Sequence, residues 1–320
     1  MGRYVLKRLL LMIPVIIGTS LIIFLAMNLA QGDFVDTMVL EDMSEEKVAE
    51  LRAKYNLDKN VFVQYGEYMW KLLHGDMGTS WSSQRPVTEI FLRLLPNTLY
   101  LAFACCIIGT ILAVPLGMLS ATHRGGIIDN LCSLISVLGM SVPAFWLGMM
   151  LMLLFSLRLG WLPSGGNEKW YCVLMPAFTL GAGRMAALAR TTRSTMVDTL
   201  SQDYLRTARA KGIPERTVVT KHAFKPASIP ILNIAMTQLA GALSGAALTE
   251  SVFSWPGVGR QIVSSVQQRD IPTACGCLIM ICILVGFVEL ITDLLYAYVD
   301  PRLRTHFAAT EGKRRKKANG

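Results

Sequence analysis

Charged residues are scarce within the apolar stretches of this 320-residue sequence, and four of them are candidates for chemistry: Arg184, Glu250, Glu289 and Asp293. An ionisable side chain inside a membrane span is costly, so it marks a site of catalysis or transport unless it reaches an interface. Glu250 and Asp293 lie near the ends of their stretches, and we expect them to be interfacial. Arg184 and Glu289 lie deeper and are the two candidates for a polar path through the membrane.

Two hypotheses stay open for Arg184. Its long side chain reaches the cytoplasmic interface from the inner third of its span, or it lines the path and meets Glu289 or a carboxylate of a substrate. A guanidinium suits the second role because it offers a carboxylate two donors at once.

Other patterns point away from enzyme chemistry. Cys275 and Cys277 are spaced to hold a soft metal, but no His lies nearby, and packing as small apolar side chains is the favoured interpretation. The sequence contains no G-x-x-x-x-G-K-[ST] motif for binding ATP, and no Ser-His-Asp or paired-carboxylate constellation. We therefore predict no catalytic residue, no metal site and no cofactor.

A membrane-embedded enzyme and a secondary transporter are two classes of protein that the sequence leaves open. An enzyme would need polar catalytic residues facing the interior of a helix bundle, and the few charged candidates above are all that the sequence offers. A secondary transporter usually has about ten or more spans and an internal repeat, which this sequence lacks. Copurification of an ATPase would argue against both of these classes.

The composition indicates a protein of the bilayer. Hydrophobic residues make up 52% of the chain, charged residues only 17%, and the mean hydropathy is +0.44, whereas about a quarter of the residues in an ordinary soluble domain are charged. A helix needs about 20 apolar residues to cross the hydrocarbon core. Six runs have about that length: Leu9 to Ala30, Asn97 to Thr122, Leu131 to Leu157, Tyr171 to Leu188, Ile229 to Val252 and Thr273 to Val299. The predicted fold is an all-α membrane protein with six transmembrane helices.

Basic residues predict the orientation. With the N-terminus inside, 19 of the 31 Lys and Arg residues and 6 of the 22 acids fall on one side. The large loop on the other side, residues 31–96, carries 7 basic and 11 acidic residues. Since loops rich in Lys and Arg stay in the cytoplasm, we expect both termini to be cytoplasmic. The basic tail 301–320, with KRRKK at 313–317, is predicted to lie over anionic membrane lipid.

The first apolar run follows Arg3, Lys7 and Arg8, as the apolar part of a signal peptide would. Its 22 residues exceed such a segment, and no small-x-small cleavage site closes it. Residues 1–30 are therefore expected to form a cytoplasmic N-terminus and an uncleaved first transmembrane helix.

The external segment 31–96 is predicted to be helical. Ser44 stands where a helix N-cap is expected, and Val48, Leu51 and Tyr55 share one helical face. A second amphipathic stretch, VFVQYGEYMWKLL, is expected close to the membrane, before the glycines of HGDMGTS break it. The segment is either a cap over the membrane part or a docking platform for an external partner, and the sequence leaves both open.

A polar, basic insert interrupts the apolar second half of the chain. Residues 201–228 hold six Lys or Arg residues and two acids. Within it, Ser201, Leu205, Ala208 and Gly212 recur at helical spacing and give a narrow face of mostly small residues. Small residues permit the close approach that a socket on another protein requires.

The end of this first short helix is predicted at Gly212, and Pro214 begins a second helix that Pro226 and Pro230 end. Two short helices around a Gly-containing turn are also the outline of a DNA-binding helix-turn-helix. Between two spans only about 40 residues apart, however, such a motif cannot enter a groove of DNA. We therefore predict no nucleic-acid partner.

The stretch DYLRTARAKG, followed by IPERTVVTKHAFKPASIP, resembles the cytoplasmic coupling segment of permease subunits of binding-protein-dependent ABC importers. The general signature of such permeases is Glu-Ala-Ala, three residues and then Gly. Arg206, Thr207 and Ala208 stand in for it ahead of Gly212, and residues 222–225 replace the Ile-x-Leu-Pro expected downstream. Both departures are usual in the dipeptide, oligopeptide and nickel subfamily.

Three further stretches are similar to that subfamily, in the same order along the chain. They are YNLDKNVFVQYGEYMWKLLHGDMGTSWSSQRPVTEIF after the first span, ESVFSWPGVGRQIVSSVQQRDIP before the last span, and DLLYAYVDPRLR near the C-terminal end. The resemblance covers nearly the whole chain.

The resemblance implies a type I ABC importer permease, the first of two homologous permeases, in the cell membrane of a prokaryote. Its implied partners are a second homologous permease, two ABC ATPase subunits and an extracytoplasmic solute-binding protein. ATP is then hydrolysed by partner subunits, so this chain itself is not expected to be an enzyme. The expected substrate is a dipeptide or oligopeptide, with nickel or a metal chelate as the alternative.

The resemblance also assigns parts of the chain. Residues 97–300 are expected to form a five-helix permease core that includes the coupling segment 191–227. The residues expected to couple the permease to the ATPase are Asp203, Tyr204, Leu205, Arg206, Thr207, Ala208, Arg209, Lys211 and Gly212.

Overall fold

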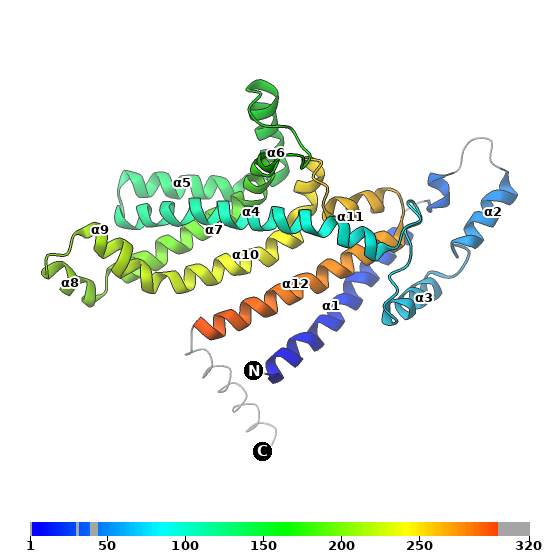
Figure 1. The fold of residues 1–320 in the computed structure, drawn as a ribbon, viewed down its shortest axis with the longest axis horizontal. Coiled ribbons are helices and arrows are strands. Elements are labelled where there is room, and N and C mark those ends of the chain that lie inside the picture. The colour runs from blue at the N-terminus through cyan, green and yellow to red at the C-terminus, as the bar shows by residue number, and fades with distance from the viewer. Residues whose placement is uncertain (1, 30–31, 39–43, 300–320) are drawn as a thin grey trace, which may run out of the picture. The chain divides into compact units, whose positions relative to one another are not determined.

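The computed structural model describes residues 2–29, 32–38 and 44–299 (Figure 1). Every regular element in these ranges is helical, apart from one antiparallel bridge between Thr79 and Pro86. The longer helices are α1 (Gly2–Leu29), α2 (Glu45–Lys54), α3 (Val61–Leu73), α4 (Val87–Thr122), α5 (Ile127–Ser141), α6 (Ala144–Leu151), α7 (Leu174–Leu200), α8 (Asp203–Ala210), α10 (Phe224–Val252), α11 (Val258–Gln267) and α12 (Ile271–Val299). The shorter ones are η1 (Val35–Thr37), η2 (Met152–Arg158), η3 (Trp170–Val173), α9 (Glu215–Thr217) and η4 (Val218–Ala223). The predicted basic tail 301–320 lies outside the described residues.

Five helices in the described ranges are long and apolar enough to cross a membrane: Tyr4–Leu29, Val87–Thr122, Trp170–Leu200, Glu215–Val252 and Ile271–Leu295. They correspond to five of the six predicted runs, the third being the exception. That run is instead a pair of helices, Ile127–Ser141 and Ala144–Arg158, bent by 104°. Within the described residues, there is a sixth candidate span only if this pair is one broken span.

The bend between α5 and α6 occurs at Pro143. A proline disfavours the helical conformation in the residue before it, and Val142 is accordingly extended, with φ −78° and ψ 124°. The helix resumes at Ala144 and continues into the π-helical η2. A hydropathy window averages across such a break, which is why the sequence predicts one straight span.

The chain divides into two compact units. Unit 1 comprises Met1–Ala102, Gly148–Pro176 and Leu243–Gly286, and unit 2 comprises Phe103–Leu147, Ala177–Ala242 and Phe287–Gly320. The predicted division of the chain is of another kind, because it follows the position of each segment relative to the membrane. This division into 1–30, 31–96, 97–300 and 301–320 stays a prediction.

Unit 1 brings α1 and α3 together. The ring of Phe24 on α1 lies 5.4 Å from Tyr65 and 6.4 Å from Tyr68 on α3, and the hydroxyls of Ser20 and Tyr65 are 3.0 Å apart. α1 also runs beside α12 (Figure 1), where Phe24 shares an apolar cluster with Cys275. Part of the segment 31–96 is thus attached to the first membrane-spanning helix.

The helical character predicted for the segment 31–96 is confirmed by α2 and α3. Ser44 is the N-cap of α2, although its side chain makes no capping hydrogen bond. Val48, Leu51 and Tyr55 are half-buried on one face, as their spacing predicts.

Glu250 is fully buried within the protein. Its carboxylate accepts hydrogen bonds from Thr98 Oγ1 at 2.7 Å and from the backbone N–H of Arg260 at 2.8 Å. The carboxylate, which is carried by α10, therefore lies at the N-terminus of α11, where the helix dipole favours a negative charge. The WPGVGR turn folds back over the carboxylate, and a Cβ at Gly257 would collide with it. A place for Glu250 at the membrane interface stays a prediction.

Unit 2 has one large apolar core, to which α4, α7, α8, η4 and α10 contribute. Leu188 and Met196 of α7 are completely inaccessible within it. Where α4 crosses α7, a Cβ at Gly117 would meet the side chain of Thr192 at 2.6 Å. Glycine at position 117 permits this close approach of the two helices.

Candidate functional site

The polar insert of unit 2 folds as two helices around a tight turn (Figure 1). α8 ends at Ala210, and Gly212 takes a left-handed conformation with φ +75°. The N–H of Ile213 donates to the carbonyl of Ala208 (3.4 Å), and that of Gly212 donates to the carbonyl of Arg209 (2.9 Å). This is the Schellman pattern, in which a glycine after the C-cap closes the helix, so the prediction that Gly212 ends the helix is confirmed.

The apolar stripe of α8 packs inside unit 2. Leu205 is 0% exposed and Ala208 is 9% exposed, and both belong to the core formed with Val218 and Ala223 of η4. The face predicted from Ser201, Leu205, Ala208 and Gly212 is therefore not an external surface throughout. A short amphipathic helix buries its apolar stripe against its own chain, which removes Leu205 and Ala208 from direct contact with a partner.

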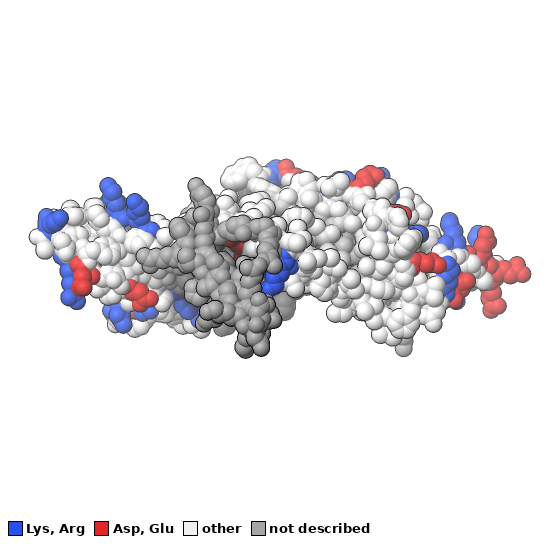
Figure 2. Space-filling view, turned by 90° about the horizontal axis from the view of Figure 1, so that it is seen from below, with Lys and Arg blue, Asp and Glu red and all other residues white. Residues whose placement is uncertain are grey.

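The other predicted coupling residues are exposed: Asp203, Tyr204, Arg206, Thr207, Arg209, Lys211 and Gly212. Figure 2 shows Lys and Arg side chains, with acidic side chains among them, at the end of the view where α8 and α9 lie. Arg206 approaches Asp203 at 3.6 Å, but both side chains are largely in solvent. This exposed face of α8 is polar and basic and is available to a partner.

Arg209 and Glu215 hold the two helices of the insert together. The guanidinium donates from Nε to Oε2 at 2.9 Å and from Nη2 to Oε1 at 2.8 Å. This two-point hydrogen bond fixes direction as well as distance, and the Glu215 carboxylate raises the pKa of Arg209. The ion pair spans the turn at Gly212 and therefore links α8 to α9.

The second helix of the insert continues into the next membrane span. α9, η4 and α10 follow one another without a break, so the prediction that Pro226 and Pro230 end this helix is wrong. Pro226 comes shortly after a π-helical turn, which already departs from the hydrogen-bond pattern that a proline breaks. Pro230 lies in a membrane-spanning helix, where local adjustments and serine side chains accommodate proline, and Ser228 Oγ donates to the carbonyl of Lys225 at 2.8 Å.

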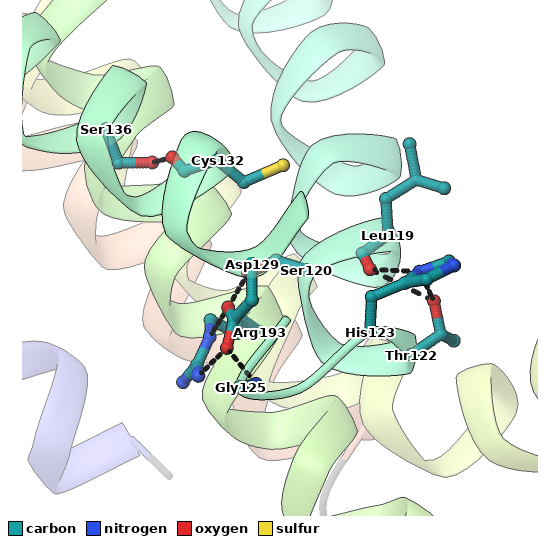
Figure 3. A network of polar contacts seen from close by, with 9 residues as sticks. All are labelled: Leu119, Ser120, Thr122, His123, Gly125, Asp129, Cys132, Ser136 and Arg193. Atoms are coloured by element: carbon teal, nitrogen blue, oxygen red, sulfur yellow. Dashed lines mark hydrogen bonds and ion pairs between the residues drawn. The ribbon is translucent and has the colours of Figure 1, made fainter. Parts of the chain in front are cut away.

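A buried ion pair fastens α5 to α7 in the same unit (Figure 3). Both carboxylate oxygens of Asp129 accept hydrogen bonds at 2.6 Å from Arg193, from Nε and Nη2. Ser120 Oγ and the N–H of Gly125 donate to the same carboxylate at 2.5 Å and 2.9 Å. Sequence analysis missed this network, because residues 64 positions apart carry no local signal of pairing.

Arg184 joins α7 to α10. It is half-buried, and its guanidinium donates to the carbonyl of Leu180 at 3.0 Å and to the carbonyl of Gly241 on α10. In return, Gln238 Nε2 donates to the carbonyl of Arg184 at 2.9 Å. Glu289 is exposed on α12. A place for Arg184 and Glu289 in a translocation path stays a prediction.

The described residues contain no group of three or more His, Cys, Asp or Glu side chains that is able to hold a metal ion. Cys275 packs in the cluster with Phe24, whereas Cys277 packs in another cluster with Val87 and Val258. Residues two apart on a helix point in nearly opposite directions. The two thiols therefore belong to separate parts of the core.

Solved structures show which class of protein has this fold. A chain of the MetNI methionine ABC transporter in an inward-facing conformation is similar with a TM-score of 0.55 and 21% identity, covering 67% of this chain and 97% of that chain. A chain of an amino acid ABC transporter crystallised with histidines has a TM-score of 0.51 and 18% identity, covering 67% of this chain and 94% of that chain. The fold is that of a type I ABC importer permease.

Sequence comparison identifies the family. Residues 113–305 match the family described as "Binding-protein-dependent transport system inner membrane component", and the chain belongs to it. The chain is 40% identical over 305 residues to the glutathione transport system permease protein GsiC of Salmonella typhimurium, covering 95% of this chain and 99% of the relative. It is 36% identical over 314 residues to the oligopeptide transport system permease protein AppB of Bacillus subtilis, and 35% identical over 336 residues to the dipeptide transport system permease protein DppB of Escherichia coli K12, each covering 95% of this chain and 99% of the relative.

These matches confirm the predicted permease of a binding-protein-dependent ABC importer in a bacterial inner membrane. A permease of this kind works with an ATPase and with a solute-binding protein.

Proposed function

We propose that this chain imports short peptides, as one of two homologous permeases that form the translocation path. The observation that carries this proposal is its match, over 95% of its length, to permeases named for glutathione, oligopeptides and dipeptides. Import of nickel or a metal chelate is the alternative outcome of the test below.

The complete importer then contains this chain, a second permease, two ATPase subunits and an external binding protein in a lipid bilayer. This chain does not hydrolyse ATP itself. Its sequence has no phosphate-binding loop of the G-x-x-x-x-G-K-[ST] type, and its named relatives are permease proteins of ABC systems.

In this importer, residues 191–227 are the coupling segment. The exposed polar face of α8 contacts the ATPase, while Leu205 and Ala208 anchor α8 to the permease core. Because α9, η4 and α10 are continuous, a displacement of α8 is transmitted directly into a membrane-spanning helix. The Arg209–Glu215 pair stiffens the turn through which the movement passes.

The orientation follows from this role. The coupling segment lies in the cytoplasm with both termini, and residues 31–96 lie on the side of the binding protein. The balance of 7 basic and 11 acidic residues in 31–96 supports this placement.

The test is uptake by the purified importer in liposomes that contain ATP inside and the cognate binding protein outside. Labelled dipeptides, an oligopeptide, glutathione and Ni²⁺ are offered separately. ATP-dependent accumulation of at least one of the peptides supports the proposal. Accumulation of Ni²⁺ and of none of the peptides refutes the peptide assignment and leaves the permease role intact.

A further inference from the structure

Unit 1 contains a cavity of about 380 Å³ that no part of the coupling mechanism uses. Its lining comes from α1, the end of α2, α3, the segment before α4 and the first residues of α12. Its volume falls within the range of small-molecule sites, which is roughly 300–1,000 Å³. Most of its lining comes from the segment 31–96.

Aromatic rings form a fixed wall of this cavity. Tyr55 and Trp81 line it with their ring centroids 5.4 Å apart, and Phe34 contacts both rings at 5.2 Å and 5.5 Å. Phe24 and Tyr68 add two more rings to the lining, and the hydroxyl of Tyr68 is buried without a hydrogen-bond partner in the described residues. Such a surface suits an apolar or aromatic side chain of a ligand.

A buried carboxylate holds this wall in place. Asp270 is 1% exposed, and it accepts hydrogen bonds from Ser80 Oγ at 2.6 Å, from the N–H of Trp81 at 3.2 Å and from Thr273 Oγ1 at 2.8 Å. The loop that carries Trp81 is therefore tied to the start of α12. The wall is preorganised, which reduces the entropy lost when a ligand binds.

Two residues with left-handed backbone border the same cavity. Asn56 and Gln84 both have φ +55°, a conformation that asparagine tolerates but that is uncommon for glutamine. Gln84 is held there by hydrogen bonds from its side chain to Trp81 O at 2.7 Å and to Tyr55 Oη at 3.4 Å. Backbone strain of this kind clusters at ligand sites, where the surrounding structure maintains it.

The charges around the cavity are complementary to a molecule with a carboxylate and an ammonium group. Lys54 and Lys71 line it, and neither has an acidic partner among the described residues. Glu67 and Asp76 line it as well. Glu67 binds Lys59 through Oε1, and Asp76 binds the N–H of Gly78 through Oδ1, so each has a second carboxylate oxygen for an ammonium group.

We propose that this cavity binds a short peptide with free termini, with its carboxylate at Lys54 and Lys71 and an apolar side chain against Tyr55 and Trp81. This proposal rests on the proposed peptide function and adds a binding site on the permease itself, separate from the binding protein. The oppositely charged side chains that line the cavity favour a small zwitterion over a loop of a partner protein.

The test measures binding to the intact importer in lipid nanodiscs without the binding protein, by saturation-transfer NMR. The probes are alanyl-phenylalanine and its C-terminal amide. We expect the amide to bind at least tenfold more weakly, because it lacks the charge-assisted hydrogen bonds to the lysines. The Lys54→Gln/Lys71→Gln double variant is expected to lose this difference. Lys47→Gln, which removes a charge from α2 outside the cavity, is expected to behave like the parent.

Equal binding of the acid and the amide, or an unchanged preference in the double variant, overturns the proposal. The proposal is also overturned if the double variant binds peptide like the parent but its ATPase is no longer stimulated by the binding protein, because the cavity then docks a protein. Uptake assayed with the binding protein present separates failure of the cavity site from failure of the proposed peptide function. Peptide uptake without binding in this assay refutes the cavity site alone, whereas absence of peptide uptake refutes the function on which it rests.

Discussion

Arg209 and Glu215 form a two-point ion pair across the turn at Gly212, with both nitrogen to oxygen distances below 3.0 Å. The side chains are 38% and 61% exposed, so the pair contributes only about 0.5 kcal/mol to stability. Its geometry matters more than its energy, since it fixes the angle between α8 and the helix that continues into the membrane.

We therefore expect Arg209→Gln and Glu215→Gln to uncouple the importer. Peptide uptake should fall several-fold while the ATPase rate and the amount of inserted protein stay near the parental values. The charge-exchanged variant Arg209→Glu/Glu215→Arg is the control, because it restores an ion pair across the same turn. Recovery of uptake supports a stiffening role, and a defect as severe as in the single variants shows that Arg209 acts directly on the ATPase instead.

Gly212 gives a second test of the same turn. Its φ is +75° and a Cβ would meet no atom within 4 Å, so substitution is opposed by backbone strain of about 1–2 kcal/mol and not by a clash within this chain. Gly212→Val should reduce uptake strongly relative to ATP hydrolysis, whereas Gly212→Asn should retain most of it, because Asn tolerates this conformation. Normal transport by a normally expressed Gly212→Val protein would contradict a coupling role for the turn.

The pair of Asp129 and Arg193 is predicted to stabilise unit 2. Asp129 is 3% exposed, and removal of one partner from such a pair leaves an uncompensated charge, at a cost of about 2–3 kcal/mol for a partly accessible site. Asp129→Ala should lower the unfolding temperature of the importer in detergent by several degrees. Asp198→Ala, which removes an acid from α7 outside this network, is the matched control. Equal stability of both variants would show that the network contributes little.

The placement of the segment 31–96 is tested with single cysteines. Lys54→Cys and Gln84→Cys are exposed positions and should react with an impermeant thiol reagent added to intact cells. Arg206→Cys and Lys211→Cys on the coupling segment should react only after lysis. Background from the seven native cysteines is subtracted with the parent protein, and the reverse pattern of labelling inverts the topology.

Hydropathy predicts the helices of this fold well because length and apolarity decide whether a helix spans the membrane. It does not predict how a chain folds back on itself. The sequence does not show that the WPGVGR turn covers Glu250, or that η4 packs against Leu205 and Ala208 of the expected contact face. Motif resemblance predicts the coupling segment, but neither the Arg209–Glu215 pair nor the Asp129–Arg193 pair has a signal in composition or periodicity. Such pairs depend on distances that exist only after folding.

The last prediction concerns Arg184, for which substitution separates the observed joining of two helices from the predicted role in the translocation path. Its guanidinium joins α7 to α10 through the carbonyls of Leu180 and Gly241, and loss of such charge-assisted bonds costs about 1.5–3 kcal/mol. Arg184→Gln should therefore lower the unfolding temperature of the importer, and Arg184→Lys should recover part of the loss, since an ammonium group reaches one carbonyl. Uptake normalised to the amount of folded importer isolates the second role. If Arg184 also lines the translocation path, uptake per folded importer falls in Arg184→Gln, with the steepest loss for peptides that carry an additional carboxylate. If both variants transport like the parent on that scale, the path hypothesis is wrong and Arg184 serves to join two helices.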